Sequence, residues 1–306
     1  MTEALPTDRS SIDTERANER TAQLDALSLA DAFDCLQAED DGVALAVANA
    51  KPGLVAAVEL AEARWHRNGR IFYVGAGTSG RLAALDAAEL PPTFQTDPER
   101  VQFLIAGGEG ALVRSVEGAE DSREAAAAEL DARDLSTGDL VFGIAAGGST
   151  PYVHGAIAHA KSRGAATVFL ACVPVDQADD DADVSIRLLT GPEPIVGSTR
   201  MKAGTATKLA LNRFSTLLMV RLGKVYGNRM VDVRALANAK LIDRGTRLVA
   251  ELTGLDREAA HAALIMANGR VPVAVLMAKR GVTADRAEAL LERAGGLRAA
   301  LANGSE

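Results

Sequence analysis

The stretch that decides the fold reads Ile71-Phe72-Tyr73-Val74-Gly75-Ala76-Gly77-Thr78-Ser79-Gly80. A short run of large apolar residues leads directly into a glycine-rich turn. Further apolar runs of strand length follow, most of them separated by segments long enough for a helix: Val101–Ile105, Leu140–Ile144, Thr167–Cys172 and Val184–Leu188. Buried strands that alternate with helices are typical of βαβ units around a parallel sheet. The sequence therefore predicts an α/β fold.

The expected architecture is a three-layer sandwich, a parallel five-stranded sheet flanked by helices, with a small helical subdomain at the C-terminal end. We predict an N-terminal arm and helices over residues 1–55, the α/β domain over 56–236 and the helical subdomain over 237–306. Residues 1 to about 25 are rich in charges and hydroxyl groups, so this arm is expected to be mobile, or ordered only against a partner surface. Helices are expected to begin near Ser28, Val43 and Pro52, and to cover 123–130, 154–162, 204–222, 256–268, 272–280 and 284–293.

Composition and charge exclude several classes of protein. The 306 residues carry a formal net charge of −8 without a basic stripe, so nucleic acid is not an expected partner. Cys35 and Cys172 are the only cysteines, which gives neither a disulfide framework nor a metal-binding spacing. Residues 1–20 lack the apolar core of a signal peptide, and no apolar run reaches the roughly 18 residues that cross a bilayer. We expect a cytoplasmic protein without a membrane segment.

The turn Gly75–Gly80 matches the G-x-G-x-x-G pattern of dinucleotide-binding proteins. That pattern also requires an acid about 20 residues further on, after the second strand, to hold a ribose. Here the second strand ends in Ala106-Gly107-Gly108 and Glu99 precedes it, so no dinucleotide is expected. Backbone N–H groups at a helix N-terminus, with the hydroxyls of Thr78 and Ser79, favour a phosphate monoester instead. The alternative is a turn that only packs the strand against the helix.

Two later loops combine glycines with hydroxyl groups. Gly147-Gly148-Ser149-Thr150-Pro151 follows the third predicted strand, so it lies at the same sheet edge as the first turn and could hold the same ligand. Ser198, Thr199 and Lys202 belong to a donor-rich segment, residues 197–205, just before a long predicted helix. Ordinary turn composition and a capped helix start with exposed charges are the respective alternatives.

Carboxylates are the best candidates for acid–base chemistry. Glu89 lies about one helix length after the first turn and directly before Leu90-Pro91-Pro92, where the two prolines are expected to stop the helix. Most glutamates are merely solvated, but a cluster follows the second strand: Glu109, Glu117, Glu120 and Asp121. The histidines show no metal-like spacing and no nucleophile–histidine arrangement, so neither a metal nor a cofactor is expected.

Several segments, in order along the chain, carry a resemblance to a known family. They are Thr14-Glu15-x-x-Asn18, Gly75–Glu89 with Pro91-Pro92-Thr93-Phe94, Ile105–Glu109, Val116–Ser122, Thr150–Val153, Gly197–Thr205, and Gly223–Asn228 with Met230–Val233. They resemble the N-acetylmuramic acid 6-phosphate etherases, members of the sugar isomerase-type phosphosugar-binding (SIS) domain superfamily. The run Glu117–Ser122 combined with Gly77–Arg81 is highly specific.

The resemblance implies a carbon–oxygen lyase of peptidoglycan and amino sugar recycling, with a phosphosugar-binding domain over 56–236. It implies cleavage of a D-lactyl ether by Glu120 as base and Glu89 as acid, followed by addition of water. It also implies a metal-free homodimer with sites near the subunit boundary, and a sugar phosphate held by Gly77, Thr78, Ser79, Gly148, Ser149, Thr150, Ser198, Thr199 and Lys202.

One departure and two alternatives accompany this resemblance. The family's third loop usually reads Ala-Ala-Ser-Gly-Arg-Thr, whereas here it is Ala145-Ala146-Gly147-Gly148-Ser149-Thr150, which loses a cation. The first alternative is a non-catalytic sugar-phosphate-binding regulator, because the glucokinase regulatory protein resembles the etherases but lacks an acid where Glu89 stands. The second is an aldose–ketose phosphate isomerase built on the same domain. The presence of Glu89 favours an enzyme over the regulator, and Leu90-Pro91-Pro92 with the C-terminal helices favours the etherase over the isomerase.

Overall fold

The structure, a computed structural model, describes residues 8–233, 235–236 and 238–302. The chain forms two compact units. The first contains the chain up to Ala87 together with Glu99–Ser215, and the second contains Ala88–Pro98 together with the chain from Thr216 onward. The domain boundaries predicted after residues 55 and 236 remain predictions.

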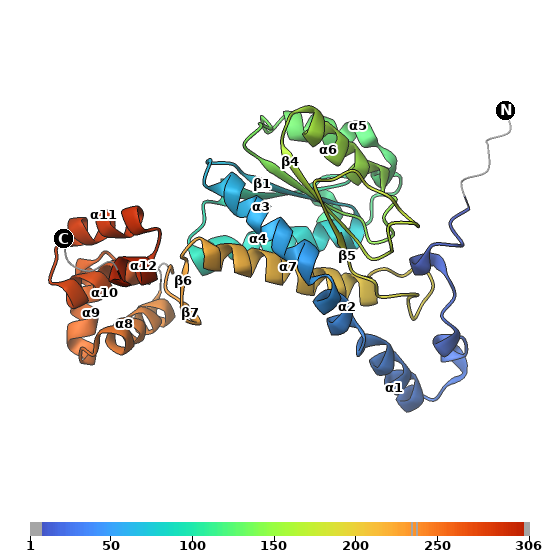
Figure 1. Cartoon of the computed structure of the whole chain (residues 1–306). Coiled ribbons are helices and arrows are strands. Elements are labelled where there is room, and N and C mark those ends of the chain that lie inside the picture. The colour runs from blue at the N-terminus through green and yellow to red at the C-terminus, as the bar shows by residue number, and fades with distance from the viewer. Residues whose placement is uncertain (1–7, 234, 237, 303–306) are drawn as a thin grey trace. The chain divides into compact units, whose positions relative to one another are not determined.

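The first unit contains a five-stranded parallel sheet with the strand order β2-β1-β3-β4-β5 (Figure 1). Its strands are β1 (Ile71–Gly75), β2 (Val101–Ile105), β3 (Leu140–Ile144), β4 (Ala166–Ala171) and β5 (Val184–Arg187). Each agrees with the predicted strand to within one residue at either end, which confirms the α/β fold. Gly75 pairs with Ile105 on one side and with Ile144 on the other, so the three strands end level with one another.

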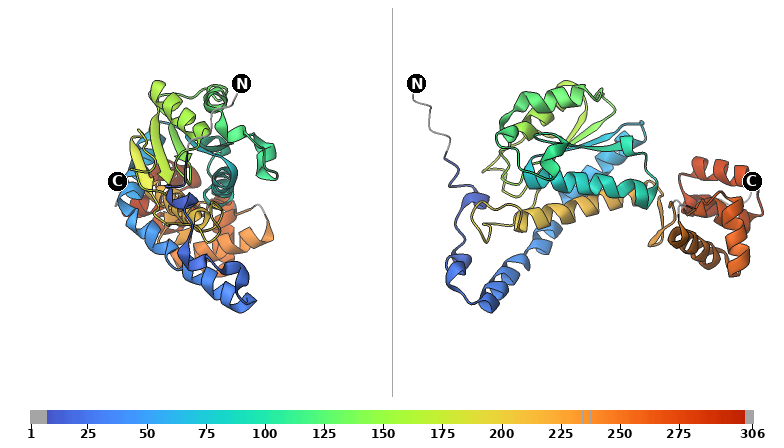
Figure 2. Two further views of the ribbon diagram at one scale, coloured as in Figure 1. Left: turned by 90° about the vertical axis from the view of Figure 1, so that its right-hand side faces the viewer. Right: turned by 180° about the vertical axis from the view of Figure 1, so that it is seen from behind.

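Helices cover both faces of the sheet, which gives the expected three layers (Figures 1 and 2). On one face, α5 (Arg123–Asp131) and α6 (Pro151–Ser162) share a buried core with Phe72 and Val74 of β1. On the other face lie α3 (Lys51–Trp65), α4 (Gly77–Phe94) and α7 (Lys202–Arg221). There the ring of Phe142 lies 5.0 Å from that of Phe214 and 5.6 Å from that of Tyr73, measured between centroids. Strand residues therefore alternate between two buried layers, as expected of a parallel sheet.

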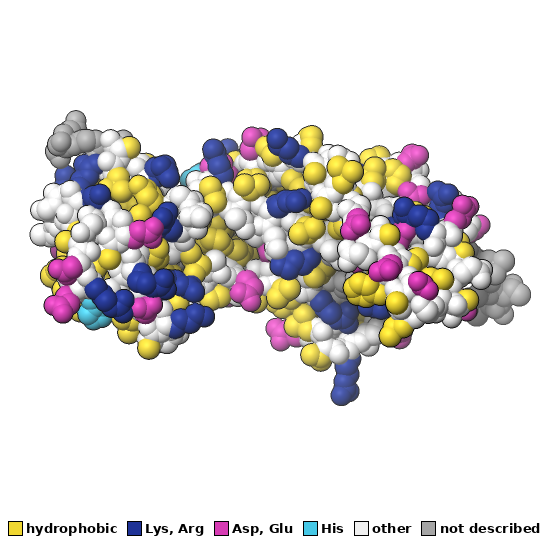
Figure 3. All heavy atoms as spheres, turned by 90° about the horizontal axis from the view of Figure 1, so that it is seen from below, with side chains coloured by type: hydrophobic (Ala, Val, Ile, Leu, Met, Phe, Trp, Pro, Cys, Tyr) yellow, Lys and Arg dark blue, Asp and Glu magenta, His cyan; other side chains and the backbone are white. Residues whose placement is uncertain are grey.

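The N-terminal helices begin where the sequence predicts. The Ser28 hydroxyl accepts the Asp31 N–H at the start of α1 (Leu29–Asp40), α2 spans Val43–Asn49, and Pro52 stands in the first turn of α3. Large apolar side chains of α1 and α2 are exposed: Leu29 at 90%, Phe33 at 66% and Leu45 at 63%. The view from below also shows exposed hydrophobic side chains among Lys and Arg (Figure 3). Such apolar surface is typical of contact with another protein.

The predicted mobile arm is wrong for residues 8–26, which fold onto the first unit as short 3-10 turns. The Thr21 hydroxyl donates to the Pro194 carbonyl at 2.8 Å, and the Asn18 amide donates to the Glu39 carboxylate at 2.7 Å. Polar side chains of this segment, whose composition predicted a solvated arm, are therefore hydrogen-bonded to other parts of the same chain. Residues 1–7 lie outside the described residues.

The expectation that Pro91 and Pro92 stop their helix is also wrong. Both prolines lie inside α4, which continues to Phe94. A proline ring fits the helical φ angle, so the prolines remove N–H donors without ending the helix here. The end is set by Gln95, whose φ is +51° and whose N–H donates to the Pro91 carbonyl at 3.0 Å.

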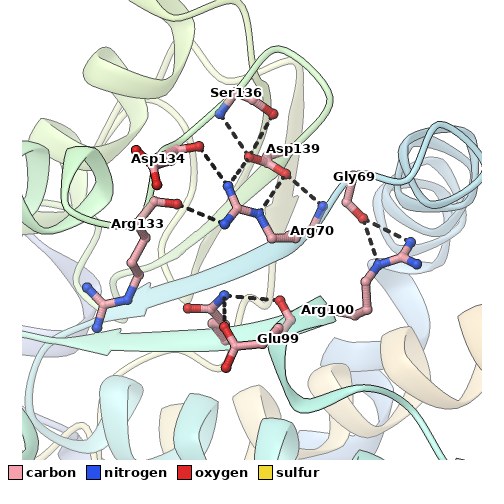
Figure 4. A network of polar contacts seen from close by, with 9 residues as sticks. Gly69, Arg70, Glu99, Arg100, Arg133, Asp134, Ser136 and Asp139 are labelled. Carbon is pink, nitrogen blue, oxygen red and sulfur yellow. Dashed lines mark hydrogen bonds and ion pairs between the residues drawn. The ribbon is translucent and has the colours of Figure 1, made fainter.

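The amino ends of the central strands are tied together by Arg70 and Asp139 (Figure 4). The Arg70 guanidinium donates to both carboxylate oxygens of Asp139, at 3.2 and 2.9 Å, and also to the carbonyls of Arg133 and Asp134. Burial raises the pKa of Asp139, but hydrogen bonds from Arg70 and from the Ser136 backbone outweigh burial and lower it overall. These polar contacts occupy the amino edge of the sheet. A ligand is therefore expected at the opposite edge, at the carboxyl ends of the strands.

The second unit is largely helical, as the sequence predicts. Its helices after Asn238 are α8 (Ala239–Thr253), α9 (Arg257–Met266), α10 (Val271–Arg280), α11 (Ala284–Ala294) and α12 (Leu297–Ala302). They share a core that includes Val249, Leu264 and Val275. Helix α8 and a short hairpin of β6 (Val225–Tyr226) and β7 (Arg229–Met230) were not predicted. Among the described residues, no single helix is long and apolar enough to span a membrane. Two pairs of helices, each bent at a short break, reach that length and composition when taken together.

Candidate active site

The glycines of the first turn divide into two groups with different roles. A Cβ on Gly75 would lie 2.7 Å from the Gly80 nitrogen, and a Cβ on Gly80 would lie 2.5 Å from the Ile105 side chain. Both positions therefore need glycine for close packing of strand and helix, which is the alternative raised above. Between them, Gly77 has a φ of +52° and begins α4, so Thr78 and Ser79 stand in the first helical turn. Backbone N–H groups there have no helical partner.

The loop after β3 lies beside this turn, because β3 pairs directly with β1. Gly148 has a φ of +77°, and a Cβ there would lie 2.4 Å from the Ala178 side chain. Its carbonyl accepts the His154 Nε2–H at 2.7 Å. Gly148 thus shapes the loop, while Ser149 and Thr150 stand at the start of α6, whose first residue is Pro151.

A cavity of about 360 Å³ is lined by both loops, at the carboxyl edge of the sheet. It lies wholly within the first unit. Its lining is mostly polar and comes from five segments of the chain: Arg9, Ile12, Thr14 and Glu15; Ala76–Ser79 and Arg81; Glu120 and Asp121; Ala146, Gly147 and Ser149–Pro151; Gly197 and Thr199. The structure therefore brings together seven predicted site residues: Gly77, Thr78, Ser79, Glu120, Ser149, Thr150 and Thr199.

Glu120 stands on a short 3-10 helix, Ala119–Asp121, that is fixed at both ends. Gly118 precedes it with a φ of +71°, and the Ser122 hydroxyl accepts the Ala125 N–H to begin α5. The Glu120 side chain is exposed and lines the large cavity. It also lines a second cavity of about 130 Å³, as Arg81 and Glu117 do.

The N-terminal segment supplies cavity residues that the sequence analysis did not assign. Gly197 donates its N–H to the Thr14 carbonyl at 3.0 Å, and Asp13 donates its N–H to the Gln177 side chain at 2.8 Å. The Thr14 hydroxyl is buried, and no hydrogen-bond partner is recorded for it among the described residues. The motif Thr14-Glu15-x-x-Asn18 was a signal for these residues, but it does not say what they do.

The predicted site residues before α7 also differ from one another in role. Thr199 lines the cavity, whereas Ser198 and Lys202 do not. The Lys202 ammonium is buried and donates to the Glu39 carboxylate at 2.6 Å, so in this structure it neutralises an internal acid. The buried Glu193 carboxylate accepts the N–H groups of Lys202 and Ala203 and thereby caps α7. Burial raises the pKa of Glu193 despite these two hydrogen bonds.

Glu89 is exposed on α4 and is not among the residues that line the cavity. It follows Gly77 by twelve residues of one continuous helix. At the rise of an α-helix this is roughly 18 Å along the axis. A hexose phosphate bound at the start of α4 is much shorter than this distance.

A different carboxyl lies on the buried side of α4. Asp86 accepts the Tyr73 hydroxyl at 2.9 Å and the Ser215 hydroxyl at 3.1 Å. Burial raises the pKa of Asp86 to about 6, against the opposing effect of these two hydrogen bonds. Asp86 lines neither cavity and therefore concerns stability. Within the described part of the chain, no group of three or more His, Cys, Asp or Glu could hold a metal ion.

Comparison with known proteins identifies the class of domain that this chain contains. The family model of the SIS domain matches residues 119–214, and that of the glucokinase regulatory protein N-terminal SIS domain matches residues 53–161. A phosphoheptose isomerase from Neisseria gonorrhoeae is similar over 62% of this chain and 98% of its own, with 16% identity and a TM-score of 0.45. The two family models show that the chain contains an SIS domain within residues 53–214.

Two curated relatives narrow the class to one family. The N-acetylmuramic acid 6-phosphate etherase of Synechococcus sp. (strain CC9605) is 53% identical over 94% of this chain and 90% of its own length. That of Nostoc punctiforme is 54% identical over 94% of each chain. The chain belongs to the N-acetylmuramic acid 6-phosphate etherase family, which confirms the resemblance read from the motifs.

Proposed function

We propose that this protein cleaves the D-lactyl ether of N-acetylmuramic acid 6-phosphate, giving N-acetylglucosamine 6-phosphate and D-lactate, as a carbon–oxygen lyase of amino sugar recycling. The observation that carries the proposal is 53% identity over 94% of the chain to a curated etherase. A cavity that combines two helix N-termini, several hydroxyls and Glu120 supports it. Such a cavity fits a small phosphorylated substrate.

The proposed chemistry needs only an acid and a base. In the open-chain sugar C1 is an aldehyde, which makes the C2 proton acidic and places the C3 ether oxygen β to the carbonyl. Glu120 removes the C2 proton, an acid protonates the departing lactate oxygen, and an unsaturated aldehyde forms. Water then adds at C3 with the proton transfers reversed. Each positioned acid or base typically contributes about 10²–10⁴-fold to the rate.

The phosphate is assigned to the two helix starts. Thr78 and Ser79 on α4, and Ser149 and Thr150 before α6, line the cavity beside N-termini that carry partial positive charge. Gly77 and Thr199 line the same cavity. Gly148, Ser198 and Lys202 are proposed to act through the shape of their loops. Anchoring the phosphate fixes C2 and C3 of the sugar for reaction.

The acid, Glu89, is assigned to a second copy of the chain. Its roughly 18 Å separation along α4 from the phosphate turn is too long for one substrate to bridge within one chain. A homodimer in which each site joins Glu120 of one chain to Glu89 of its partner removes this difficulty. The exposed apolar side chains of α1 and α2 support such an association.

The decisive experiment measures D-lactate release from N-acetylmuramic acid 6-phosphate with a coupled assay. We expect stoichiometric release by the purified protein and none by Glu120→Gln, which should also lose solvent deuterium exchange at C2 of N-acetylglucosamine 6-phosphate. Absence of D-lactate at high protein concentration would refute the proposed function. Undiminished exchange in Glu120→Gln would remove that residue from the role of base.

Subunit complementation tests the placement of the acid. Glu89→Gln and Glu120→Gln are each expected to be inactive, but a mixed dimer of the two variants holds one intact site if the acid comes from the partner. Coexpression should restore about a quarter of wild-type activity if the acid comes from the partner, because half of the dimers are mixed and each has one working site of two. If both residues come from one chain, the mixture stays inactive.

The alternatives make different predictions for the same sample. A sugar-phosphate-binding regulator, suggested by the match of residues 53–161, would bind N-acetylglucosamine 6-phosphate without releasing D-lactate from the ether. An aldose–ketose isomerase would produce a ketose phosphate and no D-lactate. The etherase relatives extend over 94% of the chain, which favours the lyase over both.

A further inference from the structure

The smaller cavity, of about 130 Å³, adjoins the proposed reaction centre. It shares Ala76, Gly77, Arg81 and Glu120 with the larger cavity, so Glu120 stands at the boundary between the two. The hydroxyl-bearing helix starts line only the larger cavity. The smaller one therefore has its own chemistry and needs its own occupant.

The occupant follows from the chemistry at C2, given the proposed function on which this inference rests. The same carbon carries the proton that Glu120 removes and the acetamido nitrogen. When the C2 proton points at Glu120, the acetamido nitrogen, one bond away from C2, must also lie near that carboxylate. The larger cavity accommodates the phosphate and the sugar chain. We propose that the smaller cavity is an acyl pocket that holds the 2-acetamido group and selects for it.

The lining fits an acetamido group at both of its ends. Apolar walls for the methyl group come from Ala106, Ala111 and Val116. Polar walls for the amide come from Ser115, Glu117 and Arg81. The Arg81 Nε–H donates to the Leu112 carbonyl at 3.0 Å, which fixes the guanidinium. The volume of about 130 Å³ accommodates the four non-hydrogen atoms of the group, since about 10–15 Å³ of such volume is enough to hold one water molecule.

Val116 is the residue through which the pocket can be filled. Its side chain is 45% exposed, so a larger side chain can be accommodated without disturbing a core. It packs on Gly107, where a Cβ would lie 2.9 Å from the Val116 Cβ, so the backbone at Gly107 holds Val116 in place. Val113 is a matched control, because it is 83% exposed and lines neither cavity.

The test compares binding of N-acetylglucosamine 6-phosphate with binding of glucose 6-phosphate, which has a hydroxyl at C2, by calorimetric titration. The wild-type protein should bind the acetamido sugar at least about tenfold more tightly, a size of effect usual for small groups in a fitted pocket. Val116→Phe should lose that preference and keep its affinity for glucose 6-phosphate. Val113→Phe should change neither affinity. Ser115→Leu, which fills the pocket from another wall, should behave like Val116→Phe.

Three results would overturn the acyl pocket: equal affinities of the wild-type protein for the two sugars, a Val116→Phe variant that retains the preference, or one that loses both affinities together. Retained binding of glucose 6-phosphate also reports that the variant is folded. D-lactate release by the wild-type protein is scored separately. Release without acetamido preference refutes the pocket alone, and preference without release refutes the lyase alone.

Discussion

Thr14 shows how one buried hydroxyl connects stability with binding. It is fully buried, no partner is recorded for its oxygen among the described residues, and it lies in the wall of the large cavity beside Gly147. An unsatisfied buried hydroxyl costs about 1–3 kcal/mol, whereas a hydrogen bond to a charged group contributes about 1.5–3 kcal/mol. We therefore expect this hydroxyl to bind the sugar phosphate at the expense of stability in the free protein.

Thr14→Val keeps the shape of the side chain and removes the hydroxyl. The variant should raise the free energy of unfolding by about 1 kcal/mol and weaken N-acetylglucosamine 6-phosphate binding by about tenfold. Urea unfolding and calorimetric titration measure the two effects. Thr190→Val is the control, because the Thr190 hydroxyl is also buried, has no hydrogen-bond partner among the described residues, and lies outside the cavity. Unchanged binding by Thr14→Val would contradict a ligand role.

Single residues also mark the limit of what the sequence predicts about the site. Thr78, Ser79, Ser149 and Thr150 were predictable, because they directly follow strands whose carboxyl ends must share one edge. Lys202 was predicted to be a ligand group because it belongs to a segment rich in hydrogen-bond donors. Its partner Glu39 lies 163 residues away, so only the folded chain reveals that the ammonium is already neutralised.

Among the elements, α1 and α7 are joined by a buried ion pair. The Glu39 carboxylate of α1 accepts hydrogen bonds from Lys202 at the start of α7 and from Asn18, and it also pairs with Arg20 at 2.6 Å. Burial raises the pKa of Glu39, but the bonds from Lys202 and Asn18 outweigh burial and lower it overall. Removing one partner of a buried pair costs more than replacing both.

Lys202→Met should therefore lower the free energy of unfolding by about 3 kcal/mol. The double variant Lys202→Met with Glu39→Leu should lose less, because no unpaired charge remains in the interior. Urea unfolding of both variants measures the difference. A single variant as stable as the wild-type protein would show that Arg20 and Asn18 are sufficient partners for Glu39.

The elements differ in how well the sequence predicts them. The strands were predictable because they contain short apolar runs, and β1, β3 and β4 are buried at every residue. The end of α4 was not, because it depends on the left-handed Gln95 and not on Pro91 and Pro92. The order of residues 8–26 was not predictable either, since their polar groups bind partners far along the chain.

For the whole molecule, Asp86 should make stability depend on pH. Its ordinary pKa of 3.8 is raised to about 6 in the folded protein. As pH rises from 4 to 6, the unfolded chain releases this proton before the folded protein does, so stability is lost. The total loss from this group is roughly 3 kcal/mol and is complete above the folded-state pKa.

Asp86→Asn removes this titration while an amide oxygen can still accept from Tyr73 and Ser215. Unfolding by urea at pH 4, 5.5 and 7 should show the wild-type protein losing stability relative to the variant as pH rises. Parallel pH profiles for the two proteins would show that Asp86 titrates as an ordinary carboxyl.

The packing of the N-terminal segment has a consequence for synthesis on the ribosome. Asn18 donates to the Pro192 carbonyl, 174 residues later, and Thr21 donates to the Pro194 carbonyl, 173 residues later. At translation rates of about 5–20 residues per second, roughly 10 to 35 s pass before these acceptors are made. During that interval β1 and its turn can already exist, while the cavity still lacks the wall formed by Thr14 and Glu15. The binding site is therefore completed late, by a segment that is translated before its other walls.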